Sequence, residues 1–314
     1  AGLLQLIFLY RFVKKYYALD FDFRFKITNK VKFFFKKLLP SIFSSGVTQI
    51  NILVGTIIAS FQSGAVSYLY YADRVYQINL AIAGIAVGTV SLPVLSKALK
   101  TKNFSQVSNI QNNSIQLSLL FSIPASLGLI IASEEIVNGL FGYGSFSPND
   151  VKLTAFALMY FGYGIVAFSL VKILSNFFFA RDNTKIPFYI SSFIVLLNII
   201  ISVTFFNQLG FLIIPIATSF STWVGVLIFI YHLNKNNLLL LQKKLFYNIL
   251  KIIFSSIIMS ILLLFTIGKY SSFLDYSYIY KSIYLLIIVG FVGAVYLLSC
   301  YLLGLLKINN YRTN

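Results

Sequence analysis

Residues 65–95 read AVSYLYYADRVYQINLAIAGIAVGTVSLPVL, and this stretch decides the class of fold. Only Asp73 and Arg74 carry a charge within it, and as a helix it is long enough to cross about 30 Å of hydrocarbon. Lipid offers the backbone no hydrogen-bond partners, so only helices and closed barrels span it. Unbroken apolarity, rather than alternation with a period of two, favours the helix. We expect Pro93 to end this span.

Similar apolar runs recur along the 314 residues, which are 58% hydrophobic and 11% charged. So few charges exclude a soluble enzyme, and a single cysteine excludes a disulfide scaffold. Lysines flanking membrane spans explain the net charge of +17 better than nucleic acid, which we do not expect as a partner. We predict an all-α polytopic membrane protein with eight full spans, near 40–61, 65–95, 113–133, 152–179, 187–206, 211–232, 248–268 and 282–306.

The positions of the basic residues predict the orientation of these spans. Twenty of the 25 Lys and Arg residues fall on one side of the predicted membrane. Three fall on the other side, Lys152, Lys269 and Lys281, while Arg74 and Lys172 remain at membrane depth. Because cytoplasmic loops carry the excess of positive charge, we expect the C-terminus to be cytoplasmic.

The first 39 residues differ from the predicted bundle that follows them. The chain opens at Ala1 inside an apolar run, so residues 1–13 are expected to be the end of a truncated transmembrane helix. Residues 14–39 are rich in Lys and Phe and form a basic cytoplasmic or interfacial linker. They suit either an interfacial helix on anionic lipid or a plain linker that follows the charge bias.

An ionisable side chain at membrane depth costs roughly 2.5–3.5 kcal/mol, so the few present are the most informative positions. On a helix, Tyr70 and Tyr71 precede Arg74 by four and three residues, and Gln77 lies four residues beyond Asp73. We favour the interpretation that Arg74 binds an anionic substrate group in an aqueous cavity, since its fork can clasp phosphate. The alternatives are neutralisation by Asp73 or snorkelling to a helix end.

The remaining candidates for chemistry are sparse. Lys172 could face the same cavity as Arg74 or snorkel toward the cytoplasm. The one histidine, His232, falls at a helix end, and Glu134 and Glu135 are consecutive rather than facing. Without paired carboxylates, a phosphate-binding loop or Cys/His metal spacing, we expect neither an enzyme nor a cofactor.

Residues 45–97 read SGVTQINILVGTIIASFQSGAVSYLYYADRVYQINLAIAGIAVGTVSLPVLSK. This stretch resembles the MurJ/MviN lipid II flippase family, with QIN, IAS, YYADR and LPxLSK in order. FGYGSFSPND (141–150) and FFFARDNTKIP (177–187) resemble a later outer loop and a later cytoplasmic turn of the same family. The resemblance runs from Ala1 to the C-terminus. It places the chain in the multidrug/oligosaccharidyl-lipid/polysaccharide exporter superfamily.

The resemblance implies a fold of two six-helix lobes followed by two extra helices. In that frame residues 40–233 form the C-lobe six-helix bundle, and residues 234–314 form two additional transmembrane helices and a cytoplasmic tail. The N-lobe would be absent from this chain. The implied function is to move lipid II, an undecaprenyl-pyrophosphate-linked precursor, from the cytoplasmic to the periplasmic leaflet for cell-wall biosynthesis. The implied partners are that lipid, the bilayer of the bacterial inner membrane and cell-wall synthesis proteins.

Carried over by position, the resemblance also implies a substrate site and a doubtful sodium site. The substrate-binding candidates are Arg74, Asp73, Gln77, Tyr70, Tyr71 and Lys172. The positions aligned with sodium ligands in some relatives are Gly55, Asn198, Ser202, Ile214 and Thr218. None of them is a carboxylate, which disfavours a hard cation, so Asn198, Ser202 and Thr218 are weak metal ligands. Two alternatives stay open: an exporter of another polyprenyl-linked glycan or a small cation, and a non-transporting membrane scaffold fragment.

Overall fold

The computed structural model describes residues 2–16, 28, 31–32 and 49–306. The chain divides into two compact units, residues 1–43 and 44–314. In the first unit, helix α1 (Gly2–Tyr16) carries exposed apolar side chains along its length. Most of the predicted linker, 14–39, and the start of the predicted span 40–61 lie outside the described residues.

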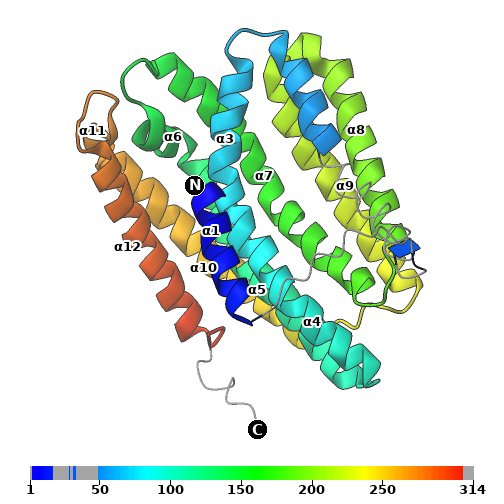
Figure 1. The fold of residues 1–314 in the computed structure, drawn as a ribbon. Helices are drawn as coiled ribbons and strands as arrows, with labels where there is room; N and C mark the ends of the chain where they lie inside the picture. The colour runs from blue at the N-terminus through cyan, green and yellow to red at the C-terminus, as the bar shows by residue number, and fades with distance from the viewer. Residues whose placement is uncertain (1, 17–27, 29–30, 33–48, 307–314) are drawn as a thin grey trace. The chain divides into compact units, whose positions relative to one another are not determined.

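Every element of secondary structure in the described part of the second unit is a helix (Figure 1), which confirms the predicted all-α class. Within residues 49–306, six helical segments are long and apolar enough to cross a membrane. A shorter apolar helix covers Gln49–Ser60. The other helices are α3 (Ala65–Leu80), η1 (Ala81–Ala86), α4 (Val87–Lys100), α5 (Phe104–Ile131), α6 (Ser133–Phe141), α7 (Pro148–Phe179), α8 (Lys185–Leu209), η2 (Gly210–Leu212), α9 (Ile213–Lys235), α10 (Lys243–Lys269), α11 (Ser271–Leu274) and α12 (Lys281–Leu302).

Helices α3, η1 and α4 follow one another as a single rod of 36 residues. The middle segment, η1, is a π-helix, and the backbone on both sides of it keeps helical angles. The expectation that Pro93 ends this span is wrong, because α4 continues through it to Lys100. Proline removes one backbone donor, and membrane helices tolerate that loss when neighbouring helices and hydroxyl side chains compensate.

Helix α7 lies at the centre of the second unit and packs against α3, α5 and α9. Its side chains Leu158, Ile165 and Phe177 are fully buried. Helices α8 and α9 pack side by side because the chain reverses between them at Gly210, whose φ of +58° suits glycine. The long run 185–235 is therefore two spans, as the sequence predicted.

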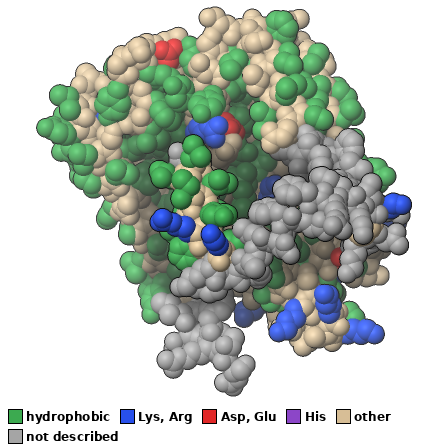
Figure 2. All heavy atoms as spheres, in the orientation of Figure 1, with side chains coloured by type: hydrophobic (Ala, Val, Ile, Leu, Met, Phe, Trp, Pro, Cys, Tyr) green, Lys and Arg blue, Asp and Glu red, His purple; other side chains and the backbone are tan. Residues whose placement is uncertain are grey.

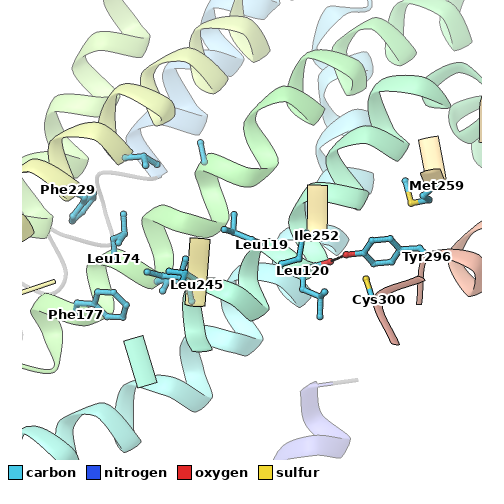
Figure 3. Packing of buried hydrophobic residues seen from close by; sticks show 14 of the residues in the cluster. Leu119, Leu120, Leu174, Phe177, Phe229, Leu245, Ile252, Met259, Tyr296 and Cys300 are labelled. Carbon is cyan, nitrogen blue, oxygen red and sulfur yellow. Dashed lines mark hydrogen bonds between the residues drawn. The ribbon is translucent and has the colours of Figure 1, made fainter. Parts of the chain in front are cut away.

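Helices α10 and α12 pack on each other, and α10 also packs on α5. In the buried cluster of Figure 3, the Tyr296 hydroxyl donates a 2.7 Å hydrogen bond to the carbonyl oxygen of Leu120. At one end of the bundle, Gln111 and Asn112 hydrogen-bond the backbone of Leu238 and Leu240. These bonds attach the segment after α9 to α5. A separate domain beginning at residue 234 stays a prediction.

The surface matches a protein surrounded by lipid. On the face shown in Figure 2, hydrophobic side chains cover most of the described surface and charged side chains are sparse. Large exposed apolar residues continue along α10 and α12, including Ile261, Phe265, Leu286 and Phe291. A soluble protein would cover such helices with charged side chains, so this exposure is typical of membrane-spanning helices.

Candidate functional site

Helix α3 is fixed to the beginning of α7, which sets the position of its polar side chains. The Tyr68 hydroxyl donates a 2.7 Å hydrogen bond to Oδ1 of Asp150. The other oxygen of that carboxylate accepts the backbone N–H of Ser147 in the capping box that starts α7. Asp150 thus links two helices, a role that no motif in the sequence indicated.

Two pairs of side chains, each four residues apart, organise the polar segment of α3. The Gln77 amide nitrogen donates a hydrogen bond to Oδ2 of Asp73. The guanidinium carbon of Arg74 lies over the Tyr70 ring, 4.6 Å from the ring centroid. Residues four apart on a helix face one another, whereas consecutive residues do not. This spacing brings Gln77 to Asp73 and Tyr70 to Arg74.

The Arg74 side chain is exposed, and within the described residues it makes neither a hydrogen bond nor an ion pair. It projects from the side of α3 opposite to Ala72 and Val75, which are buried in the bundle. The guanidinium donors that the Tyr70 ring does not cover are therefore available to an anionic group.

Tyr71, the other predicted tyrosine, has its ring centroid 5.9 Å from that of Tyr70 and also packs on two phenylalanines. Its ring centroid lies 4.8 Å from that of Phe141 and 5.3 Å from that of Phe146. Both phenylalanines flank the loop between α6 and α7. The structure therefore places Tyr71 in an aromatic cluster with this loop, and Tyr70 beside Arg74.

Lys172 lies on the face of α7 that packs against the α3–α4 rod. Four residues before it, the Phe168 ring lies 5.2 Å from the Tyr76 ring. Four residues after it, the Asn176 amide donates a 2.8 Å hydrogen bond to the carbonyl oxygen of Gly88. Lys172 itself is exposed. The two cations at membrane depth thus belong to two helices in direct contact.

Four of the five predicted sodium-site positions, all except Gly55, come together in a network of neutral groups. The Asn198 amide donates to Oδ1 of Asn51 at 2.6 Å and to Oγ1 of Thr218 at 3.2 Å. Oγ of Ser202 donates to Oδ1 of Asn198 at 3.2 Å, and Thr218 donates to the carbonyl oxygen of Ile214. A cation would have to displace these bonds. Across the described residues, no three His, Cys, Asp or Glu side chains lie close enough to hold a metal ion.

A third cation, Lys281, is buried where the loop before α12 meets the loop after α6. Its ammonium donates to the carbonyl oxygens of Gly142 and Tyr276, at 2.6 and 2.7 Å. It also lies 4.4 Å from the ring centroids of Tyr143 and Tyr276. Only 1% of the residue is exposed. The sequence identified Lys281 only as a loop charge, because its partners lie far from it along the chain or in an irregular loop.

Next to Lys281 lies a cavity of about 300 Å³, which Glu134, Glu135 and Asp275 line. Burial raises the pKa of the Glu135 carboxyl. Hydrogen bonds from Ser277 hold the pKa of Asp275 below its usual range. Glu134 and Glu135 are consecutive on α6 and point in different directions, so they do not form a facing pair for acid–base chemistry.

The apolar helices define a class, a multi-pass α-helical membrane protein, and one of these helices carries an exposed guanidinium that has no ion-pair partner among the described residues. A family model described as lipid II flippase MurJ matches residues 1–286, so the chain belongs to the lipid II flippase MurJ family.

Individual relatives agree with this family. The chain is 35% identical over 306 residues to a probable lipid II flippase MurJ from Rickettsia prowazekii, covering 95% of this chain and 60% of that protein. A solved structure of lipid II flippase MurJ in an inward closed conformation matches with a TM-score of 0.73 and 25% identity. That match covers 95% of this chain and 59% of the solved chain.

A more distant match shows the fold alone. An outward-facing multidrug resistance MATE family transporter of the MOP superfamily matches with a TM-score of 0.56 and 17% identity, over 83% of this chain and 60% of that one. The predicted fold class and family are therefore confirmed. The chain spans about three-fifths of the length of the MurJ relatives described above.

Proposed function

We propose that this chain carries the Arg74 anion site of a lipid II flippase. The activity is the movement of an undecaprenyl-pyrophosphate-linked peptidoglycan precursor from the cytoplasmic to the periplasmic leaflet by alternating access. The observation that carries the proposal is an exposed guanidinium, without an ion-pair partner among the described residues, on an apolar helix of this family. Family membership also favours lipid II over another glycan, a small cation or a scaffold role.

The physical task of such a protein is to keep a pyrophosphate and a sugar–peptide head out of hydrocarbon while the tail stays in lipid. A diphosphate without a counter-charge would be very costly at membrane depth. Arg74 supplies a permanent positive charge and a planar fork that matches phosphate oxygens. Lys172, on the neighbouring helix α7, would supply a second charge that is flexible in position.

The remaining assignments of the site follow the same geometry. Tyr70 supports Arg74 through its ring, and Asp73 and Gln77 occupy each other. Tyr71 would influence the site through the loop that it contacts rather than by binding the head directly. Membership of a flippase family favours a transporter over an enzyme.

The location of the protein is part of the proposal. We infer the bacterial inner membrane with a cytoplasmic C-terminus, supported by the predicted 20-to-3 distribution of basic residues between the two sides. Residues 40–233 would act as the C-lobe and residues 234–314 as two additional helices and a tail. Cell-wall synthesis proteins remain predicted partners.

Growth of a strain depleted of its own flippase tests the role of Arg74. With the natural full-length protein at native expression, Arg74→Ala should abolish complementation, and Arg74→Lys should restore it only partly because the planar fork is lost. Lys97→Ala is the matched control, since Lys97 is an exposed cation at the end of the same rod. Normal growth with Arg74→Ala, at an equal membrane level of protein, would overturn the proposal.

A further inference from the structure

The nearest competitor for Arg74 is the carboxylate next to it in the sequence. Asp73 is half-buried on α3 and adjacent to Arg74, and a carboxylate and a guanidinium on neighbouring residues attract each other. Such a pair would occupy the fork that an anionic headgroup needs. An arginine site beside an aspartate therefore requires something that keeps the two side chains apart.

Gln77 is placed to do this. Its amide nitrogen donates to Oδ2 of Asp73, one helical turn away. The pair uses the spacing of four residues, at which helical side chains meet. Because the amide is neutral, it satisfies the carboxylate without supplying a positive charge that would compete for the substrate's phosphates.

Arg74 contacts Tyr70, which lies one helical turn before it, whereas Asp73 contacts Gln77, one turn after it. The Tyr70 ring covers one side of the guanidinium at 4.6 Å, again across four residues. A ring contact leaves the N–H donors free, whereas a carboxylate would consume two of them. The Asp73–Gln77 pair and the Tyr70–Arg74 pair thus separate the two charges on adjacent residues.

We propose that Gln77 is a positioning residue that occupies the Asp73 carboxylate and so keeps the Arg74 guanidinium available for the diphosphate of the lipid substrate. The inference rests on the proposed function, and it gives Gln77 a different role from a direct contact with the headgroup. In this inference Asp73 competes with the substrate for Arg74, and its hydrogen bond with Gln77 prevents that competition.

A double-mutant cycle on the full chain in detergent micelles tests this role, with undecaprenyl pyrophosphate as the probe and native mass spectrometry as the readout. Gln77→Leu should weaken binding about tenfold, which corresponds to about 1.4 kcal/mol, because Asp73 then turns to Arg74. Asp73→Asn should bind the probe at least as tightly as the parent. Adding Gln77→Leu to Asp73→Asn should cause no further loss, because no carboxylate remains to capture Arg74.

The cycle separates this inference from the proposed function. If Gln77→Leu weakens binding equally with and without the Asp73 carboxylate, Gln77 contacts the lipid or supports the fold, and the positioning role is wrong. If Gln77→Leu binds as the parent does, the role is also wrong. Arg74→Ala reports on the proposed function alone: a parent that binds the probe no better than Arg74→Ala contradicts the anion site itself.

Discussion

Two cations of this chain, Lys281 and Arg74, have opposite surroundings although both belong to apolar helices. Lys281 is 1% exposed, donates to two carbonyl oxygens and lies against two tyrosine rings. Arg74 is exposed and touches a single ring. The protein supplies Lys281 with two hydrogen-bond acceptors, whereas within the described residues it supplies Arg74 with none.

This contrast separates a cation that holds the fold together from one that can bind a ligand. A buried charge persists only when hydrogen bonds satisfy it, and those bonds fix the surrounding chain. Lys281 joins the segment between α11 and α12 to the loop after α6. Within the described residues Arg74 makes no hydrogen bond or ion pair, which supports the proposal that it binds an anionic substrate.

Substitution of Lys281 should give the largest effect on stability. Lys281→Met keeps the aliphatic stem but leaves the carbonyl oxygens of Gly142 and Tyr276 without their donor, at about 1–3 kcal/mol for each unsatisfied group. The midpoint of thermal unfolding in detergent should fall clearly below that of the parent. Lys152→Met, at an exposed lysine, should leave it nearly unchanged. Equal midpoints for the two variants would show that the hydrogen bonds of Lys281 do not stabilise the fold.

Substitution of Tyr70 should have a smaller effect, and on binding rather than stability. A ring beside an exposed guanidinium contributes about 0.5–1 kcal/mol, so Tyr70→Leu should weaken binding of undecaprenyl pyrophosphate roughly two- to fivefold. Tyr70→Phe keeps the ring and should bind as the parent does. If Tyr70→Phe and Tyr70→Leu weaken binding equally, the hydroxyl rather than the ring is responsible, through a direct contact with the headgroup.

The sequence predicted most of this fold because membrane helices are specified by length and apolarity alone. The reversal at Gly210 divided a continuous helical run into two spans as expected. Pro93 misled the prediction, since the rule that proline ends a helix holds in water and fails where neighbouring helices support the backbone. The π-helix at Ala81–Ala86 had no sequence signal beyond a run of small residues.

The candidate site was predictable only in part. The free-energy cost of placing a charged side chain in a membrane identified Arg74 and Asp73 as informative positions. Helical spacing identified Tyr70 and Gln77 as their neighbours. Spacing could not say which partner Asp73 would take, and the structure shows that it is Gln77. The burial of Lys281 depends on loop contacts with Gly142, 139 residues away, which no local pattern encodes.

If Arg74 faces water at membrane depth, as proposed, a cysteine at this position should be accessible to water-soluble reagents. Arg74→Cys is treated with a charged, membrane-impermeant thiol reagent in sealed vesicles of either orientation. Ile261→Cys, on the exposed apolar face of α10, is the control for a lipid-facing position, and native Cys300 is fully buried. We predict that Arg74→Cys reacts from at least one side and that Ile261→Cys does not. An Arg74→Cys variant as unreactive as Ile261→Cys would show that Arg74 does not face water.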